Sequence, residues 1–249
     1  MMSSERKTVL VTGGTRGIGR AIVLRLSDEG WNVAFTYRNK PALAEEFACE
    51  LRASARPGQQ IRSYFADLSD DETGTRLPLQ VESDFGRLDA LVNNAGITDD
   101  GAFLAMAPAR WQHVLETNFS GTARLCLAAI PVLLRQAAPC IVNVASLAGL
   151  SGKEGQVSYA TSKGAIVGLT QWLGRRYGKE GLRVNAVAPG FIRTEMVDAL
   201  EPEMFEHILD GTALKRMGEA DEVASAVSFL LHAGYVQSTA LRVDGGFKR

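Results

Sequence analysis

The residues that decide the fold are KTVLVTGGTRGIG, from Lys7 to Gly19. An apolar run rich in β-branched residues, typical of a buried strand, leads into a glycine-rich turn and then into a helical segment. Glycines at such a junction let the backbone turn tightly and approach a pyrophosphate, which lies at the positive N-terminus of the next helix. The spacing is TGxxxGxG and not GxGxxG. Many strand–helix junctions use glycine, but the position of this turn after the first strand favours a dinucleotide site.

Strands and helices alternate along the rest of the chain. Apolar runs predict strands at residues 7–12, 32–37, 61–66, 89–93, 140–145, 183–188 and 240–243. Helical periodicity predicts helices near 17–30, 41–55, 70–86, 108–136, 157–180 and 219–232, with Gly30 and Gly181 as helix stops. Such alternation implies a parallel sheet with right-handed crossovers. We therefore expect a single α/β domain over residues 1–249, with a Rossmann-like, doubly wound, seven-stranded parallel sheet and helices on both faces.

One long segment interrupts the alternation. From Pro189 to about Lys215 the pattern is irregular, with Pro189-Gly190 at its start and scattered Met, Phe and acidic residues after it. A long excursion on an otherwise tight α/β chain is often a lid over the substrate. A packed surface excursion is the alternative. We expect a substrate-covering insert at about residues 190–215.

Composition excludes several classes of partner. The 249 residues carry a formal net charge of -1, which gives no reason to expect a nucleic acid or an anionic membrane. The three cysteines lack metal-ligand spacing, and the three histidines form no HExxH-like pair, so we expect no metal site. Neither a signal peptide nor a membrane-spanning run is evident. The unpaired cysteines suit a reducing cytoplasm, where we expect the protein to act.

The end of the second strand bears on the choice of cofactor. NAD enzymes tend to place Asp or Glu there, where the carboxylate binds the ribose 2′-hydroxyl and would repel a 2′-phosphate. Here the segment is FTYRN, residues 35–39, which contains no acidic residue. Arg38 offers a fork of donors suited to a phosphate, and Arg16 in the glycine turn can approach the same group from the other side. The two arginines and the missing acid predict NADP(H).

Three further residues suggest acid–base chemistry. Ser146 follows the fifth predicted strand, and Tyr159 and Lys163 are four residues apart on the next predicted helix, hence on one face. A free tyrosine has a pKa of about 10, and a neighbouring cation favours its ionised form. A tyrosine tuned in this way can protonate an alkoxide formed by hydride transfer, while Ser146 orients the carbonyl oxygen. Each motif alone is common by chance, but their joint occurrence downstream of the glycine turn predicts a reductase.

With these motifs the chain resembles a short-chain dehydrogenase/reductase over essentially its whole length. The matching motifs are Thr12–Gly19, Asp67-Leu68, Asn93–Gly96, Asn118, Ser146, Tyr159 with Lys163, Pro189-Gly190 with Thr194, and Arg242–Gly246. The resemblance implies that Asn118, Ser146, Tyr159 and Lys163 are catalytic, with Asn118 holding a water that connects Lys163 to solvent. The residues implied to bind the cofactor are Gly13, Thr15, Arg16, Gly17, Ile18, Gly19 and Arg38 near the phosphates, Asp67 and Leu68 at the adenine, Asn94, Ala95 and Gly96 along the ribose, and Tyr159, Lys163, Pro189, Gly190, Ile192 and Thr194 toward the nicotinamide.

Within the family the sequence is most similar to 3-oxoacyl-acyl-carrier-protein reductases. NNAGIT (93–98), ETN (116–118), SYATSKGA (158–165) and VAPGFIRTEM (187–196) carry this likeness. It implies NADPH-dependent reduction of a 3-oxoacyl thioester on acyl carrier protein, in fatty-acid or polyketide-type synthesis, by a homotetramer or homodimer. The apolar helices at 119–134 and 157–173 are candidates for the subunit interface.

Departures from the subgroup leave the substrate open. Residues 136–139 (QAAP) and Glu180 occupy positions where some of these reductases carry basic residues toward the acidic carrier, and Ser238 stands where glycine is common. The Ser238 difference should affect backbone geometry or packing more than chemistry. Two alternatives therefore remain: a reductase of a free ketone or sugar with the same mechanism, and a non-catalytic NADP(H)-sensing protein on the same fold.

Overall fold

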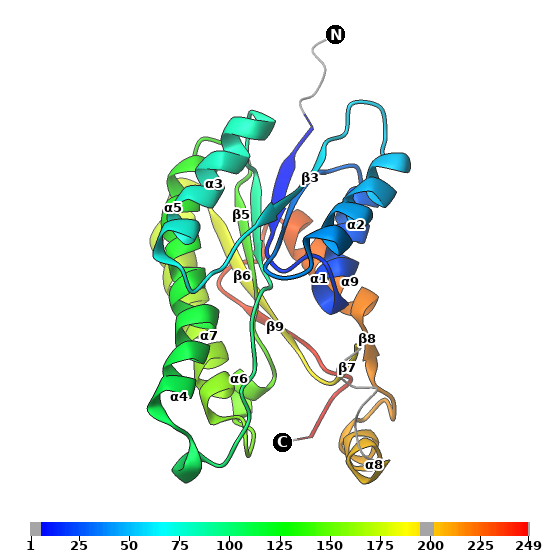
Figure 1. Ribbon diagram of the computed structural model, residues 1–249, viewed down its shortest axis with the longest axis vertical. Coiled ribbons are helices and arrows are strands. Elements are labelled where there is room, and N and C mark those ends of the chain that lie inside the picture. Colours follow the sequence, from blue (N-terminus) through cyan, green and yellow to red (C-terminus); the bar gives the residue numbers. More distant parts are fainter. Residues whose placement is uncertain (1–5, 195–201, 249) are drawn as a thin grey trace.

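The computed structural model describes residues 6–194 and 202–248 (Figure 1). Its centre is a parallel sheet with the strand order β3-β2-β1-β4-β5-β6-β9. The strands are β1 (Thr8–Val11), β2 (Asn32–Tyr37), β3 (Ile61–Phe65), β4 (Ala90–Asn93), β5 (Cys140–Val144), β6 (Arg183–Pro189) and β9 (Ala240–Val243). Each predicted strand is found to within one residue at either end, so the predicted seven-stranded, doubly wound parallel sheet is confirmed.

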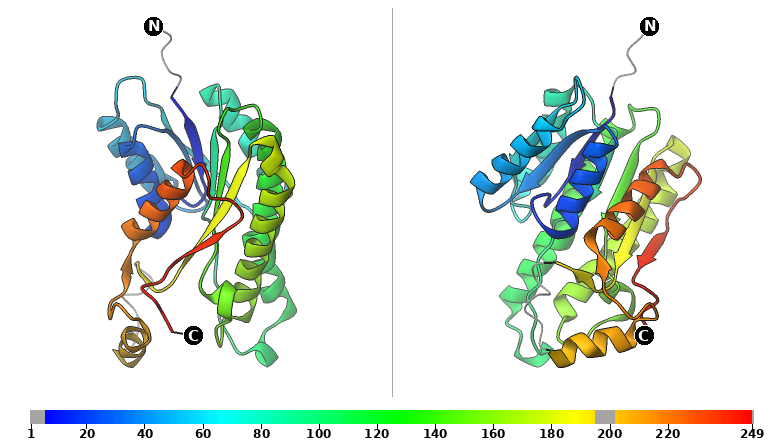
Figure 2. Two further views of the ribbon diagram at one scale, coloured as in Figure 1. Left: turned by 180° about the vertical axis from the view of Figure 1, so that it is seen from behind. Right: turned by 90° about the vertical axis from the view of Figure 1, so that its right-hand side faces the viewer.

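Helices cover both faces of the sheet, as Figures 1 and 2 show. On β1, Val9 and Val11 point to the layer made by α1 (Gly17–Asp28), α2 (Pro41–Ala53) and α9 (Ala220–His232). Leu10, between them, points to the layer made by α3 (Asp71–Phe85), α5 (Gly121–Leu133) and α7 (Val157–Tyr177). Because successive strand side chains alternate between faces, a strand covered on both sides must be apolar throughout. This requirement explains the unbroken apolar runs of the sequence.

The predicted helices are present, and one of them differs in form. The helix expected over 108–136 is divided into α4 (Pro108–Leu115), a π-helical turn (Glu116–Ser120) and α5. Immediately after the π-helical turn, Gly121 packs so closely on the Leu68 carbonyl that a Cβ at residue 121 would lie 2.3 Å from the oxygen. Gly30 (φ 93°) and Gly181 (φ 90°) follow the ends of their helical segments, as predicted.

The insert is more regular than the sequence predicted. Residues 195–201 lie outside the described residues, but the rest contains β7 (Ile192–Arg193) and α8 (Pro202–Gly211), and β7 pairs with β8 (Gly218–Glu219). The expectation of an irregular segment is therefore wrong for residues 202–211. The spacing of Phe205, Ile208 and Leu209 was the helical signal there. Short elements that the sequence did not predict are α6 (Ala148–Ser151) and a 3₁₀ turn at Phe103–Ala105.

Ser238 adopts a conformation that favours glycine. Its φ is 59°, in the left-handed region, and its backbone N–H donates to the Val184 carbonyl at 3.0 Å. Its hydroxyl is buried and has no hydrogen-bond partner among the described residues. A Cβ on Gly174, in α7, would lie 2.3 Å from the Ser238 Oγ. The serine is therefore accommodated at a cost in both backbone conformation and hydrogen bonding.

Replacing Ser238 by glycine should stabilise the protein, because glycine adopts this conformation freely and leaves no buried hydroxyl. We expect the free energy of unfolding to rise by about 1 kcal/mol. Ser238→Ala is the matched control, since it removes the hydroxyl but keeps the strained backbone and should gain less. Urea unfolding measures all three proteins, and a glycine variant less stable than the unchanged protein would contradict this reasoning.

Candidate active site

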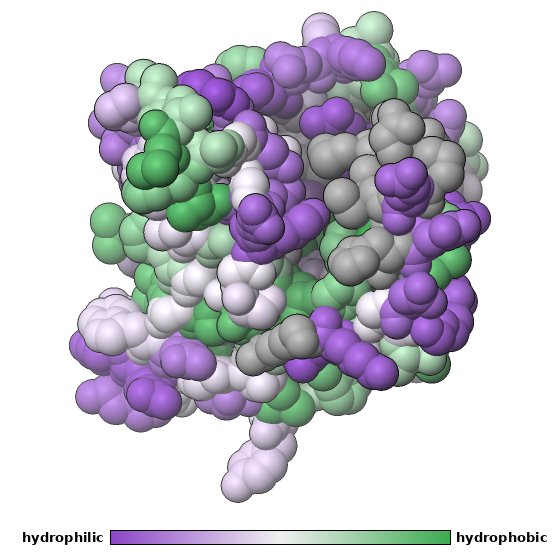
Figure 3. All heavy atoms as spheres, turned by 90° about the horizontal axis from the view of Figure 1, so that it is seen from below, coloured by the Kyte–Doolittle hydropathy of each residue, from purple (hydrophilic) through white to green (hydrophobic). Residues whose placement is uncertain are grey.

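The glycine turn lies where the strand order of the sheet reverses. β1 and β4 are neighbours, but the chain continues from β1 to β2 on one side and from β4 to β5 on the other. Ligands of open α/β sheets bind outside the carboxyl ends of the strands at such a point. Figure 3 views the molecule from that end, where apolar side chains gather near the centre of the face and hydrophilic ones toward its sides. The predicted site residues converge on this end of the sheet.

The turn after β1 leaves no room for side chains at its glycines. Gly13, with a φ of 67°, donates its N–H to the Thr36 hydroxyl at 3.0 Å, and Gly14 donates to the Thr36 carbonyl at 2.9 Å. A Cβ on Gly14 would lie 2.7 Å from the Cβ of Phe35. A Cβ on Gly19 would lie 2.0 Å from the Gly13 carbonyl oxygen. Gly19 is thus required by the packing of backbone on backbone, and Gly14 by its contact with the side chains of Phe35 and Val23.

Helix α1 presents an open N-terminus to this turn. It begins at Gly17, and no side chain caps its first turn. Its first N–H groups lack intrahelical partners and lie at the positive end of the helix dipole, which is the donor set a pyrophosphate requires. Thr15 is half-buried, and Ile18 packs on the core behind the turn. The residues present thus fit the phosphates of a dinucleotide.

Hydrogen bonds from Thr12 join the end of β1 to the loop after β4. The Thr12 hydroxyl accepts the N–H groups of Asn94 and Ala95, each at 3.0 Å. The Asn94 side-chain amide donates to the carbonyls of Thr12 and Gly13, at 2.9 and 3.1 Å. The structure therefore brings the predicted ribose-binding loop directly against the predicted phosphate turn.

The residues predicted for the adenine end lie close to one another. Arg16 and Arg38 are both exposed. Burial alone would raise the pKa of Asp67, but hydrogen bonds from Ser69 and the charge of Arg38 outweigh it and leave the pKa below its usual value. Leu68 is buried beside this carboxylate. The effect of Arg38 on this pKa places the arginine near Asp67, as expected of two residues predicted to bind the same end of the cofactor.

Ser146 and Tyr159 meet at the carboxyl end of β5. Tyr159 is on the first turn of α7, and its phenol is hydrogen-bonded to the Ser146 hydroxyl. Burial raises the pKa of Tyr159, and the bond with Ser146 lowers it by less. The phenol is therefore neutral and holds its proton in the protein alone. The sequence predicted the opposite direction for this pKa, because it counted the lysine charge and not the burial.

Lys163 is buried and faces the tyrosine. Its ammonium lies 5.8 Å from the centre of the Tyr159 ring and donates to the Val144 carbonyl at 2.7 Å. Burial lowers the pKa of Lys163 to about 8. The predicted convergence of the two side chains on one helix face is confirmed.

Asn118 and Gly96 pack beside the lysine. The Asn118 side-chain amide forms hydrogen bonds with both backbone groups of Ile97. Its oxygen accepts the Ile97 N–H at 2.8 Å, and its nitrogen donates to the Ile97 carbonyl at 2.9 Å. A Cβ on Gly96 would lie 3.2 Å from the Asn118 Oδ1 and 3.4 Å from the Lys163 ammonium. The Asn118 side chain is therefore occupied in holding the loop. The Asn118 backbone carbonyl, in the π-helical turn, accepts the Thr122 hydroxyl at 2.9 Å.

The segment after β6 reaches the same region. Pro189 accepts the Leu147 N–H at 2.8 Å, so it lies next to the residue that follows Ser146. Thr194 lies against the glycine turn, since a Cβ on Gly17 would be 3.4 Å from its methyl group. Ile192 is buried, and Gly190 packs directly against Asp244. The predicted nicotinamide-end residues are thus placed between the turn and the serine.

Sequence reasoning missed three supporting groups. They are the Val144 carbonyl that binds the lysine, the Ser162 hydroxyl, and Gly149 of α6. Ser162 accepts from the Asn118 amide at 3.0 Å and donates to the Tyr159 carbonyl at 2.7 Å. A Cβ on Gly149 would lie 2.6 Å from the carbonyl carbon of Lys163. Of these only Gly149 leaves a sequence signal, a glycine three residues after Ser146.

Residues 6–194 and 202–248 contain no group of three or more His, Cys, Asp or Glu side chains arranged to hold a metal ion. Within the same ranges no helix combines the length and the apolar character needed to cross a membrane.

Comparison with known proteins agrees with this geometry. A family model described as enoyl-(acyl carrier protein) reductase matches residues 13–248. The chain is 40% identical over 242 residues to the 3-oxoacyl-acyl-carrier-protein reductase FabG of Staphylococcus aureus, covering 96% of this chain and 97% of the relative. It is 38% identical over 244 residues to the protein of that name from Haemophilus influenzae (97% and 98%), and 34% identical over 242 residues to that from Chlamydia trachomatis (96% and 96%).

The fold and the site define a nicotinamide-dependent oxidoreductase. The chain belongs to the short-chain dehydrogenase/reductase family, and among the members of that family it is similar to 3-oxoacyl-acyl-carrier-protein reductases.

Proposed function

We propose that this oxidoreductase reduces the ketone of a 3-oxoacyl thioester, carried on acyl carrier protein, with NADPH as cofactor. The observation that carries the proposal is the convergence of Ser146, Tyr159 and Lys163 beside the glycine turn. The relatives matched over nearly their whole length support this substrate, in fatty-acid or polyketide-type synthesis. Their names favour the 3-oxoacyl group over the enoyl group that the family description mentions.

Bound NADPH supplies a hydride to the carbonyl carbon. Ser146 and Tyr159, which are hydrogen-bonded to each other, together hold the carbonyl oxygen. Tyr159 gives its proton to that oxygen as negative charge develops on it. The raised pKa of the free tyrosine keeps this proton in place until the substrate oxygen becomes basic.

Lys163 stabilises the phenolate that remains after this transfer. Its ammonium lies 5.8 Å from the centre of the tyrosine ring, in a buried environment where charges interact strongly. The carbonyl of Asn118 in the π-helical turn binds a water that connects Lys163 to solvent. Through this water the tyrosine is reprotonated after each turnover.

The residues that would hold the cofactor lie along the carboxyl edge of the sheet. The turn from Gly13 to Gly19 and the N-terminus of α1 bind the pyrophosphate, and Arg16 and Arg38 bind the 2′-phosphate. Asp67 and Leu68 bind the adenine, and residues 94–96 follow the ribose. Lys163 and residues 189–194 hold the nicotinamide end.

The whole chain acts as one catalytic domain of a homotetramer or homodimer in the cytoplasm, with the insert at 190–215 covering the substrate. Leu127 on α5 and Trp172 on α7 support an interface there, since 71% and 60% of their surfaces are exposed. Exposed apolar side chains mark an interaction surface where they form a contiguous patch.

The substrate is tested by comparing thioesters with a free ketone. We expect the value of kcat/KM for a 3-oxoacyl thioester on acyl carrier protein to exceed that for a free 3-oxo ester by about tenfold or more, because binding of remote parts of a substrate promotes turnover. An N-acetylcysteamine thioester should fall between them, and an enoyl thioester should not be reduced. Activity on the free ketone without activity on the carrier-bound thioester would contradict the proposal.

Arg38→Asp should transfer preference from NADPH to NADH, because a carboxylate repels the 2′-phosphate and accepts the 2′-hydroxyl. The ratio of kcat/KM for NADPH to that for NADH should fall by about tenfold or more, the value of one charge-assisted hydrogen bond. Arg175→Asp is the control, since this exposed arginine is near the end of α7 that lies away from the site. An unchanged ratio in the Arg38 variant would show that it does not contact the 2′-phosphate.

The pH dependence of reduction should report Lys163. Its pKa of about 8 lies below the usual lysine value, so its positive charge is present below pH 8 and is lost as the pH rises through that value. The pKa of Tyr159 is raised, so the tyrosine does not limit activity in this range. We expect kcat/KM, which reports the free enzyme, to fall on the alkaline side with a midpoint near 8. A profile flat beyond pH 10 would contradict this role for the lysine.

A further inference from the structure

The C-terminal segment of the chain packs along the end of helix α8. The Lys248 N–H donates to the Gly211 carbonyl at 2.8 Å, and the Leu214 N–H donates to the Gly245 carbonyl at 3.1 Å. Gly246 also packs closely against the Ala213 side chain, since a Cβ on Gly246 would lie 3.0 Å from the Cβ of Ala213. Residues 245–248 therefore contact residues 211–214, which form the end of the insert.

Phe247 lies between α8 and the loop after β6. Its ring occupies the space beside Gly211, where a Cβ would come within 2.6 Å of the ring. On the other side it packs against Phe191, with ring centres 5.1 Å apart and planes tilted by 54°. Phe191 stands between Gly190 and Ile192, two residues proposed above to hold the nicotinamide end of the cofactor.

The contact continues to the segment that precedes the catalytic tyrosine. The Lys153 ammonium lies 5.0 Å from the centre of the Phe191 ring, within range of a cation–π interaction. Lys153 lies between α6 and α7, six residues before Tyr159. A continuous series of contacts thus runs from α8 through Phe247 and Phe191 to the loop that leads into the catalytic helix.

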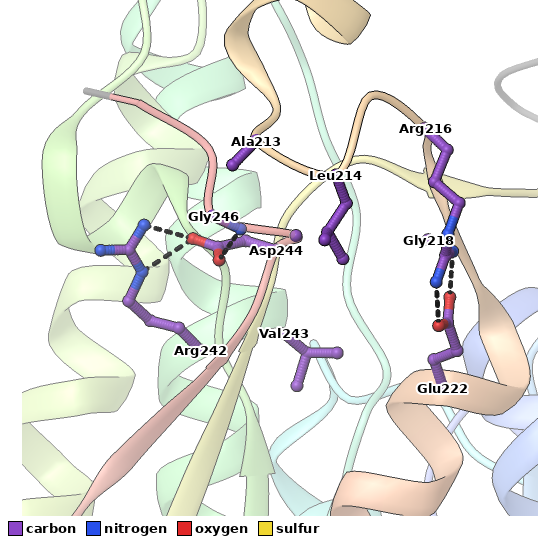
Figure 4. A pocket seen from close by; sticks show the side chains of 10 residues that line it. Ala213, Leu214, Arg216, Gly218, Glu222, Arg242, Val243, Asp244 and Gly246 are labelled. Atoms are coloured by element: carbon purple, nitrogen blue, oxygen red, sulfur yellow. Dashed lines mark hydrogen bonds and ion pairs between the residues drawn. The ribbon is translucent and has the colours of Figure 1, made fainter.

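The base of the C-terminal segment is held firmly to the end of β9. Arg242 forms an ion pair with Asp244, and Asp244 also accepts the Gly246 N–H at 3.1 Å (Figure 4). Arg242 donates in addition to the Phe247 carbonyl at 3.1 Å. The Asp244 side chain is only 7% exposed. Phe247 is therefore carried by a rigid support, while the partners on either side of it belong to separate segments.

A cleft of about 450 Å³ separates this support from the other attachment of the insert. Across the cleft, Arg216 pairs through both of its terminal nitrogens with Glu222 of α9, at 2.7 and 2.6 Å (Figure 4). The end of the insert is thus held by the Arg216–Glu222 ion pair on one side and by the packing of Phe247 on the other. Phe247 reaches the loop of residues 189–194 through its side-chain contact with Phe191. On the Arg216 side the loop is reached through the backbone, since β8 pairs with β7 and the Gly218 N–H donates to the Phe191 carbonyl at 3.0 Å.

We propose that Phe247 is a positioning residue for the substrate: by packing between Gly211 and Phe191, it sets α8 at a fixed place relative to the loop at the nicotinamide end. The proposal rests on the function proposed above, in which the insert covers the substrate. Phe247 would act through α8 and Phe191, without touching the reacting atoms. It therefore determines substrate affinity and leaves the proton transfer at Tyr159 intact.

The test is steady-state kinetics of Phe247→Ala and Phe247→Leu at a temperature well below unfolding. We expect KM for the ketone to rise by about three- to tenfold in Phe247→Ala, as expected for loss of an aromatic pair. The kcat and the dissociation constant of NADPH should each stay within about twofold, a split that a general loss of structure would not give. Phe247→Leu keeps apolar volume and should recover part of the loss.

Tyr235→Ala is the matched control, because it removes an aromatic side chain that is fully exposed. The double variant Phe191→Ala/Phe247→Ala should raise KM no more than the larger single change, since the two rings act as one unit. An unchanged KM in Phe247→Ala, or fully additive effects in the double variant, would overturn the proposal.

Hydrogen exchange separates this proposal from the proposed function. In Phe247→Ala, amides of residues 203–214 should exchange faster, whatever ketone the enzyme reduces. Faster exchange with no thioester activity in any variant would refute the proposed substrate but support the proposed contact of Phe247 with α8. Thioester activity with unchanged exchange and unchanged KM in Phe247→Ala would refute the role of Phe247 but support the proposed substrate.

Discussion

The site depends on how closely the backbone packs where β1 and β4 end. At this point the chain departs in two directions, and Thr12 bridges the gap by accepting the N–H groups of both Asn94 and Ala95. The approach leaves no room for side chains on Gly13 and Gly19, where a Cβ would lie 3.1 Å from the Ala95 Cα and 2.5 Å from the Asn94 Nδ2. It opens the N-terminus of α1 toward the same edge and fixes the course of the loop that follows β4. Since Gly96 of that loop lies against the lysine, the phosphate turn and the acid–base group share one framework.

Burial gives the two proton-carrying groups opposite shifts. It raises the pKa of Tyr159 and lowers that of Lys163 to about 8, because in each case the charged form loses hydration. The effect is to keep the tyrosine protonated and to bring the pKa of the lysine close to neutral pH. For Tyr159, the hydrogen bond with Ser146 opposes this shift without cancelling it. A tyrosine in this setting holds its proton until a substrate oxygen gains charge, which is the behaviour that reduction requires.

Much of this arrangement could be predicted from the sequence because it depends on local pattern. Continuous apolar runs such as residues 8–11 are required wherever a strand is covered on both faces, so the strands were predicted closely. The spacing of Tyr159 and Lys163 fixes a shared helix face before any tertiary contact is known. The left-handed backbone of Ser238 agrees with the expectation from the family resemblance that this serine affects backbone geometry more than chemistry.

What the sequence could not give depends on packing between distant segments. The π-helical turn at Asn118 occurs beside the close contact of Gly121 with Leu68, which lies more than fifty residues earlier in the chain. The raised pKa of Tyr159 follows from its burial, which no motif records. The role of Val144 lies in a backbone carbonyl, so its side chain leaves no signal. Phe247 was missed for the same reason, since its importance lies in touching Gly211 and Phe191 from another part of the chain.

The central claim is that Tyr159 delivers the proton while the framework around it binds the cofactor. The most direct measurement compares turnover and NADPH affinity in Tyr159→Phe, which removes only the hydroxyl. We expect kcat to fall by a factor of about a thousand, in the range of general acid catalysis, while the dissociation constant of NADPH from fluorescence titration changes by no more than about twofold. Turnover within about tenfold of the unchanged enzyme, with NADPH still bound, would contradict the assignment of the proton to Tyr159.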